Sequence, residues 1–267
     1  YVKRGQRKAV RFLQSYGRPE TRPPATGAAV RLKRGVGAEV GGEEGRQARP
    51  EAGEHFGAHY GQKMVSQVHC SSLPPAVEMR YVDEELPYEL SVTGFSPLIP
   101  HDYESSNLPV AVFVFHLKNP TQETLETAIA FSFQNNIGWS DRHSYEGTFN
   151  ELFRENGLAG IALRRSGTDI PAEHRGELAI ATPEQAGKVT RLREWDAVGD
   201  GAAFFSTFAT EGELGTAEVP VARGRAKAGA LAVKVGLGPG ETKDIPFFLT
   251  WYFPQMDLRD VGVTSFG

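Results

Sequence analysis

Carboxylates are the first side chains in this chain to consider for chemistry, because 33 of its 267 residues are Asp or Glu. Cleavage of a glycosidic bond with retention needs two carboxyl groups about 5 to 5.5 Å apart, one of them with a raised pKa. Many acidic residues fall instead in polar segments that solvent should reach, namely residues 83–85, Glu123, Glu126, Glu211 and Glu213. We therefore predict no complete catalytic pair and name no catalytic residue.

The histidines and the cysteine give weaker signals. Among seven His, only His55 and His59 have a four-residue spacing suited to a metal, and no Glu stands between them as in metalloproteases. We predict no metal site and no cofactor. His116 lies in an apolar run, which favours a hydrogen-bonded core histidine over a catalytic one. Cys70 would need a neighbouring base to act as a nucleophile, so we expect an unreactive free thiol.

Two further segments have residue types that bind ligands. Gly236–Gly240 has the glycines of a phosphate-binding loop but lacks the helix and the Lys-Ser/Thr pair that should follow, so we predict a hairpin turn. Gln134–Trp139 follows an apolar run, and its amides and indole could contact a sugar or a neighbouring domain. Asn135, Asn136 and Trp139 are the candidate contact residues. The alternative is a strand-end turn in which Trp139 covers the core.

Composition places the chain among ordinary globular proteins, with 40% apolar and 23% charged residues. No run of 18 apolar residues occurs, so no transmembrane segment is predicted. The single cysteine suits a reducing compartment. The start Tyr1-Val-Lys-Arg4 has neither an initiator Met nor an apolar signal core. We expect a piece of a longer, cytoplasmic protein, with peripheral attachment to membranes left open.

Charge is distributed unevenly. Residues 1–50 carry 12 Lys or Arg against 4 Asp or Glu, a net of +8, which leaves 17 against 29, a net of −12, for the rest. Such a basic arm could bind nucleic acid or an anionic membrane. No nucleic-acid motif accompanies the charge, so we expect no nucleic-acid partner. Residues 15–62 are rich in Gly, Pro, Arg, Ala and Glu without apolar periodicity, which favours a disordered Gly/Arg-rich insertion.

The chain divides at about residue 62. Residues 1–62 are interpreted as a partial first strand, at Ala9–Gln14, followed by the flexible basic insertion, and residues 63–267 as one β-sandwich. In the second part, short apolar or alternating runs are separated by turn signals. They predict strands over residues 77–81, 88–92, 109–118, 125–133, 160–163, 177–181, 188–195, 230–235 and 245–251.

Three of these segments carry further expectations. Residues 109–118 are apolar at nearly every position, which favours a strand covered on both faces. Within 125–133, small residues oppose large ones, a spacing that would let two sheets approach closely. Residues 202–208 suit a helical turn with Phe204 and Phe208 on one face. Nine or more short strands without strong helical periodicity predict an all-β fold, a large antiparallel β-sandwich with long loops.

Five segments, in order, resemble one enzyme family. They are Leu86–Pro100, Asn107–Phe113, Lys118–Thr121, Phe133–Trp139 and Leu249–Pro254. Together they are similar to the N-terminal domain of the non-lysosomal glucosylceramidase and β-glucosidase family, glycoside hydrolase family 116. The resemblance runs from about residue 64 to residue 254, although the Gly-rich opening segment of the family is absent.

The resemblance implies an N-terminal β-sandwich followed, in family members, by an (α/α)6 barrel that holds the retaining carboxylate pair. No residue here matches that pair. We therefore expect a non-catalytic domain that packs on and positions a C-terminal barrel absent from this chain, in a parent enzyme that hydrolyses β-glucosides such as glucosylceramide.

Two other functions remain open. A stand-alone carbohydrate-binding module would need exposed coplanar aromatic rings on one sheet face, and the candidates are Trp139, Tyr145, Trp195, Trp251 and Tyr252. An electrostatic tether to anionic membranes would use residues 1–50.

Overall fold

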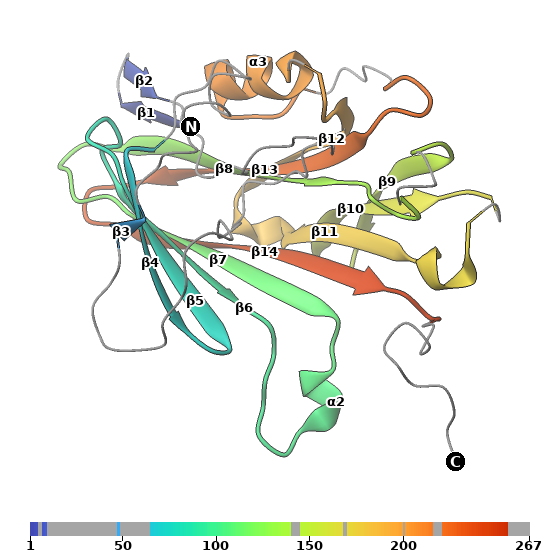
Figure 1. The fold of residues 1–267 in the computed structure, drawn as a ribbon. Helices are drawn as coiled ribbons and strands as arrows, with labels where there is room; N and C mark the ends of the chain where they lie inside the picture. Colours follow the sequence, from blue (N-terminus) through green and yellow to red (C-terminus); the bar gives the residue numbers. More distant parts are fainter. Residues whose placement is uncertain are drawn as a thin grey trace.

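The structure is a computed structural model that describes residues 1–4, 7–9, 47–48, 65–139, 145–167, 170–199, 201–215 and 221–255. These residues form two antiparallel sheets that face each other, with a helix over the outer side of the smaller sheet (Figure 1). The predicted all-β antiparallel sandwich is confirmed. The predicted insertion over 15–62 lies outside the described residues except at Gln47 and Ala48.

The smaller sheet has five strands in the order β12-β13-β8-β1-β2. Their bounds are β1 (Val2–Arg4), β2 (Arg7–Ala9), β8 (Leu125–Gln134), β12 (Lys188–Asp196) and β13 (Lys227–Leu237). The larger sheet has nine strands in the order β3-β4-β5-β6-β7-β14-β11-β10-β9. Their bounds are β3 (Gln47–Ala48), β4 (Gln67–Leu73), β5 (Ala76–Val82), β6 (Glu89–Phe95), β7 (Val110–Lys118), β9 (Thr148–Glu155), β10 (Leu158–Arg165), β11 (Glu177–Pro183) and β14 (Thr242–Tyr252).

Short helical segments connect some of the strands. They are α2 (Tyr103–Ser106), the 3-10 turns η1 (Ala172–His174) and η2 (Glu184–Ala186), and α3 (Ala202–Glu211). Among the helices of the described residues, none is long and apolar enough to cross a bilayer.

The main core lies between the two sheets. Phe131 of β8 stacks on Phe247 of β14 with ring centroids 5.2 Å apart, and Phe247 meets Phe115 of β7 edge-on at 5.7 Å. All three side chains are at most 1% exposed. They come from alternate, inward-facing positions of their strands, so strand periodicity builds this core directly.

A second core lies under α3, on the outer face of the smaller sheet. Ala128 of β8 and the alanines of β13 pack there against Phe204 and Phe208 of the helix, together with Trp195 of β12. The predicted phenylalanine face of the helix is confirmed, and the helix runs on to Glu211. The expectation that the small residues of β8 let two sheets approach is wrong, because they make room for the aromatic rings of α3.

Strand β7 also differs from its prediction. Phe115 and Leu117 face the core and are fully buried. Val112, Val114 and His116 point to the outer face of the larger sheet and are only half-buried. The expectation of cover on both faces is therefore wrong. Valine is common on half-buried strand faces, so an apolar run alone does not show whether one or both faces of a strand are covered.

Candidate functional site

The three predicted contact residues follow directly after β8. Asn135 is completely buried, and its Nδ2 donates to the carbonyl oxygens of Phe149 at 3.0 Å and Arg164 at 2.9 Å. Its Oδ1 accepts the backbone N–H of Ile137 at 3.1 Å. This amide therefore ties the end of β8 to β9 and β10, because buried polar groups need such partners.

Asn136 and Trp139 are half-buried in the same turn. Asn136 Oδ1 accepts from Gln134 Nε2 at 2.9 Å, and the Trp139 ring stacks on Tyr145 with centroids 6.1 Å apart. Burial raises the pKa of Tyr145 to about 12, so its hydroxyl stays neutral and accepts from Gln134. The arrangement is that of a strand-end turn over the second core. A contact of Asn135, Asn136 or Trp139 with another molecule stays a prediction.

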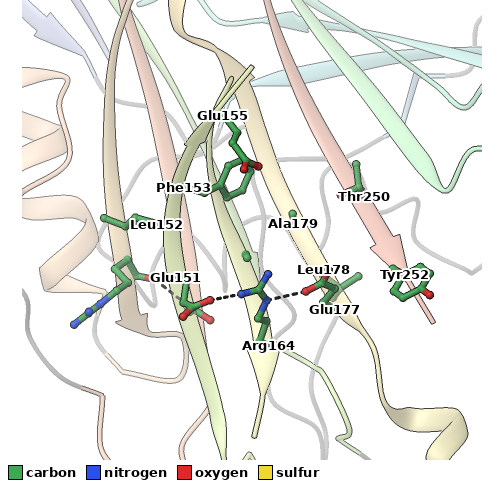
Figure 2. Close-up of a pocket in the computed structure, with 13 residues that line it drawn as sticks. Glu151, Leu152, Phe153, Glu155, Arg164, Glu177, Leu178, Ala179, Thr250 and Tyr252 are labelled. Atoms are coloured by element: carbon green, nitrogen blue, oxygen red, sulfur yellow. Dashed lines mark hydrogen bonds and ion pairs between the residues drawn. The ribbon is translucent and has the colours of Figure 1, made fainter. Parts of the chain in front are cut away.

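The structure adds a groove that sequence reasoning missed. It is an open cavity of about 690 Å³ on the outer face of the larger sheet, across β9, β10, β11 and β14 (Figure 2). The strand register aligns Glu151, Ala162, Ala179 and Thr250 in one row across these four strands. The two alanines leave space, and longer polar side chains stand around it.

One arginine joins two carboxylates at this groove. Arg164 Nε donates to Glu177 Oε2 at 2.7 Å, and its Nη1 pairs with Glu151, as the dashed lines in Figure 2 show. The hydrogen bond that Arg164 donates to Glu177, more than the charge of Glu151, raises the pKa of Arg164. We call Glu151, Arg164 and Glu177 the charged clamp.

The charged clamp suits binding rather than hydrolysis. The guanidinium of Arg164 already engages the carboxylates of Glu151 and Glu177. The three side chains are 43–52% exposed, so solvent screens the pairs and their contribution to stability is small.

Three carboxyls elsewhere are also unsuited to proton donation. Hydrogen bonds from Lys188, then Lys234, lower the pKa of Glu213. The backbone N–H of Gly238 lowers the pKa of Glu241, and that of Ser105 lowers the pKa of Asp102. These shifts are opposite to the raised pKa that a catalytic acid of a glycosidase requires.

A hydroxyl, an imidazole and a carboxylate form a chain on the outer face of the larger sheet. His116 Nε2 lies 3.0 Å from Thr93 Oγ1, and its Nδ1 lies 2.8 Å from Asp244 Oδ1. The order is that of a hydrolase triad. However, β6 pairs with β5 and β7 on either side of Thr93, so its backbone amides are not free to form an oxyanion hole.

His116 is therefore hydrogen-bonded, as predicted, but the prediction of a core position is wrong. The side chain is 36% exposed, because even-numbered positions of β7 face outward. Cys70 is half-buried on β4, and burial raises the pKa of its thiol, the reverse of the shift in a reactive cysteine.

The two histidines with a spacing suited to a metal, His55 and His59, lie outside the described residues. In the part of the chain that the structure describes, no three or more His, Cys, Asp or Glu are placed to hold a metal ion.

The aromatic residues do not form one flat platform. Tyr145 and Trp195 are buried. Trp251 and Tyr252 are 37% and 61% exposed, but as neighbours on β14 they point to opposite faces of the sheet.

Two solved structures are distant matches to this chain. A protein from the human microbiome assigned as a kojibiose phosphorylase matches at a TM-score of 0.33 and 10% identity, over 70% of this chain and 20% of that chain. The heparan sulfate lyase HepC from Pedobacter heparinus matches at 0.27 and 8% identity, over 73% of this chain and 23% of that chain. This chain thus spans about a fifth of those proteins, and likenesses this distant do not bear on function.

Comparison with protein families is decisive. The family described as "beta-glucosidase 2, glycosyl-hydrolase family 116 N-term" matches residues 43–263, which is most of the chain. That range contains the charged clamp, the turn after β8 and every strand of both sheets apart from β1 and β2. The chain therefore belongs to the N-terminal domain family of glycosyl hydrolase family 116.

Proposed function

We propose that this chain is the non-catalytic N-terminal domain of a larger β-glucosidase and that it packs on and positions a C-terminal (α/α)6 barrel. The catalytic carboxylates would lie in that barrel, and the substrates would be β-glucosides such as glucosylceramide. Family membership supports the enzyme class. The charged clamp is the observation that carries the non-catalytic role, because it commits Glu151 and Glu177, two of the three carboxylates that line the groove, to one guanidinium.

The same proposal extends to the cell. The parent enzyme would be cytoplasmic and would reach a glycolipid substrate by peripheral attachment to a membrane. The single, free cysteine supports a reducing compartment.

The activity of the chain itself is the direct test. The purified 267-residue chain should release no 4-nitrophenol from 4-nitrophenyl β-glucoside above the buffer rate. Glu151→Gln and Glu177→Gln should leave that background unchanged. Turnover by the wild-type chain that disappears in either variant would show a catalytic carboxylate in the domain and would refute the proposal.

A carbohydrate-binding module is the alternative. Tyr252 favours it, since this exposed ring borders the groove beside the charged clamp. The divergent directions of Trp251 and Tyr252 count against it. If the module exists, the chain should bind soluble β-glucans in calorimetry, and Tyr252→Ala should abolish the heat of binding.

A further inference from the structure

Exposed hydrophobic side chains are concentrated at one place. Eleven large hydrophobic residues are exposed in the described part of the chain. Nine of them lie at one end of the larger sheet, which we call the apolar edge: Leu73, Phe95, Leu98, Ile99, Tyr103, Leu108, Trp251, Tyr252 and Phe253. The remaining two, Val82 and Leu152, lie elsewhere. Scattered hydrophobics need no explanation, but a concentration of exposed apolar side chains around one end of a sheet indicates an interaction surface.

Strand pairing explains why these residues meet. Leu73 pairs with Ala76, Ala76 with Phe95, and Phe95 with Val112, so β4, β6 and β7 share this end of the sheet. Trp251 of β14 donates its backbone N–H to Pro109 at 3.1 Å. The loop from 96 to 109, with α2, extends from the same end (Figure 1).

The loop from 96 to 109 is held in shape by its own hydrogen bonds. Ser106 Oγ accepts the N–H of Ile99 at 2.8 Å and lies 2.6 Å from the carbonyl oxygen of Asp102, to which it donates. Asp102 Oδ1 caps the N–H of Ser105 at 2.9 Å. No residue of α2 is buried. The loop is thus ordered while its apolar side chains face solvent, and a preordered surface loses less entropy on binding.

The place where β14 ends indicates which molecule covers the apolar edge. The last described strand, β14, ends at Tyr252 within the apolar edge, and the family match ends at residue 263. A domain that follows in the enzyme is therefore tethered beside this surface, which raises its effective concentration there. The charged clamp adjoins Tyr252 in the groove, so the surface has an apolar centre with a charged border, as protein interfaces do.

We propose that the C-terminal catalytic domain of the same enzyme docks on the apolar edge. The proposal rests on the proposed function and names the surface through which it acts. Leu98 and Tyr103, which are 63% and 79% exposed on the loop that extends from this end of the sheet, take part in the contact.

Hydrogen exchange of the full-length enzyme against the isolated chain tests the surface directly. The amide hydrogens of peptides that cover residues 96–109 and 249–255 should exchange at least about ten times more slowly in the full-length enzyme than in the isolated chain. Slower exchange confined to another surface would refute the apolar edge and leave the proposed function standing. Equal exchange over the whole domain would refute the packing role as well.

Paired variants of the full-length enzyme provide the second test. Leu98→Ser with Tyr103→Ser should lower the midpoint of thermal inactivation of β-glucosidase activity, whereas Val82→Ser, at a 38% exposed site outside the apolar edge, should not. In the isolated chain both variants should unfold at the wild-type temperature. Equal midpoints for the double variant and Val82→Ser would refute docking at this edge. Protection of the edge by glucosylceramide vesicles, and not by the catalytic domain, would identify it as a membrane surface and also refute the proposal.

Discussion

The residue type of Asn135 and its position after an apolar run mark it as a candidate contact residue. The structure places the side chain inside the fold, where one amide joins the ends of three strands. An amide after a strand has the same appearance in a sequence whether it points inward or outward. The direction depends on where β9 and β10 lie, and their contact with β8 is set by the tertiary fold.

We predict that Asn135→Ala lowers the free energy of unfolding by about 2–4 kcal/mol, because two partly buried carbonyl oxygens lose their donor. Urea denaturation followed by tryptophan fluorescence measures the change. The control is Asn136→Ala in the same turn, where the side chain is half-buried and the loss should stay below about 1 kcal/mol. Equal losses in the two variants would contradict the role assigned to Asn135.

The hairpin of β9 and β10 shows the limits of apolar periodicity at the scale of an element. Glu155 pairs with Leu158 across a two-residue turn, Asn156-Gly157, in which both residues have positive φ, 51° and 76°. Asn-Gly is the preferred sequence for such a turn, because both residues tolerate the left-handed region. This dipeptide was the signal that could have located β9, whose polar and charged residues hide its alternation.

We predict that Gly157→Ala lowers the free energy of unfolding by about 1 kcal/mol or somewhat more. No atom lies within 4 Å of the added Cβ, so only the backbone conformation opposes the change. Gly236→Ala in β13 is the matched control, since the space there is equally open and φ is not in the left-handed region. The midpoint temperature of thermal unfolding should be lower for Gly157→Ala and unchanged for Gly236→Ala. The opposite ranking would argue against the turn.

At the scale of the whole molecule, aromatic rings join the two sheets. Phe131 belongs to the smaller sheet and Phe247 to the larger one, and their stacking closes the core between them. Because the sheets share this core, neither buries its inner face alone. We expect them to unfold together in one cooperative transition.

We predict that Phe247→Ala lowers the free energy of unfolding by about 3–5 kcal/mol, from lost burial and the cavity left between the sheets. Phe248→Ala is the control: the neighbouring residue has the same side chain but lies half-buried on the outer face, and its loss should be clearly smaller. Circular dichroism and fluorescence should give coincident transitions in both variants. Separate transitions for the two sheets would contradict the shared core.

The sequence by itself determined nine of the strands, the all-β class and the enzyme family. Alternation of apolar and polar residues is a local property with a period of two, and it marked β5, β6 and β8 without knowledge of their neighbours. The hairpin at Gly236–Gly240 was equally local, and it joins β13 to β14 as predicted.

Only the tertiary structure decided the order of the strands and what covers each face. The small residues of β8 pack against α3, a helix about 70 residues later in the chain, rather than against a second sheet. The outer face of β7 is left half-buried. The charged clamp depends on the pairing of three successive strands, and the apolar edge is made by residues from strands far apart in sequence. Such pairings follow from the packing of the whole core, which no local pattern of residues contains.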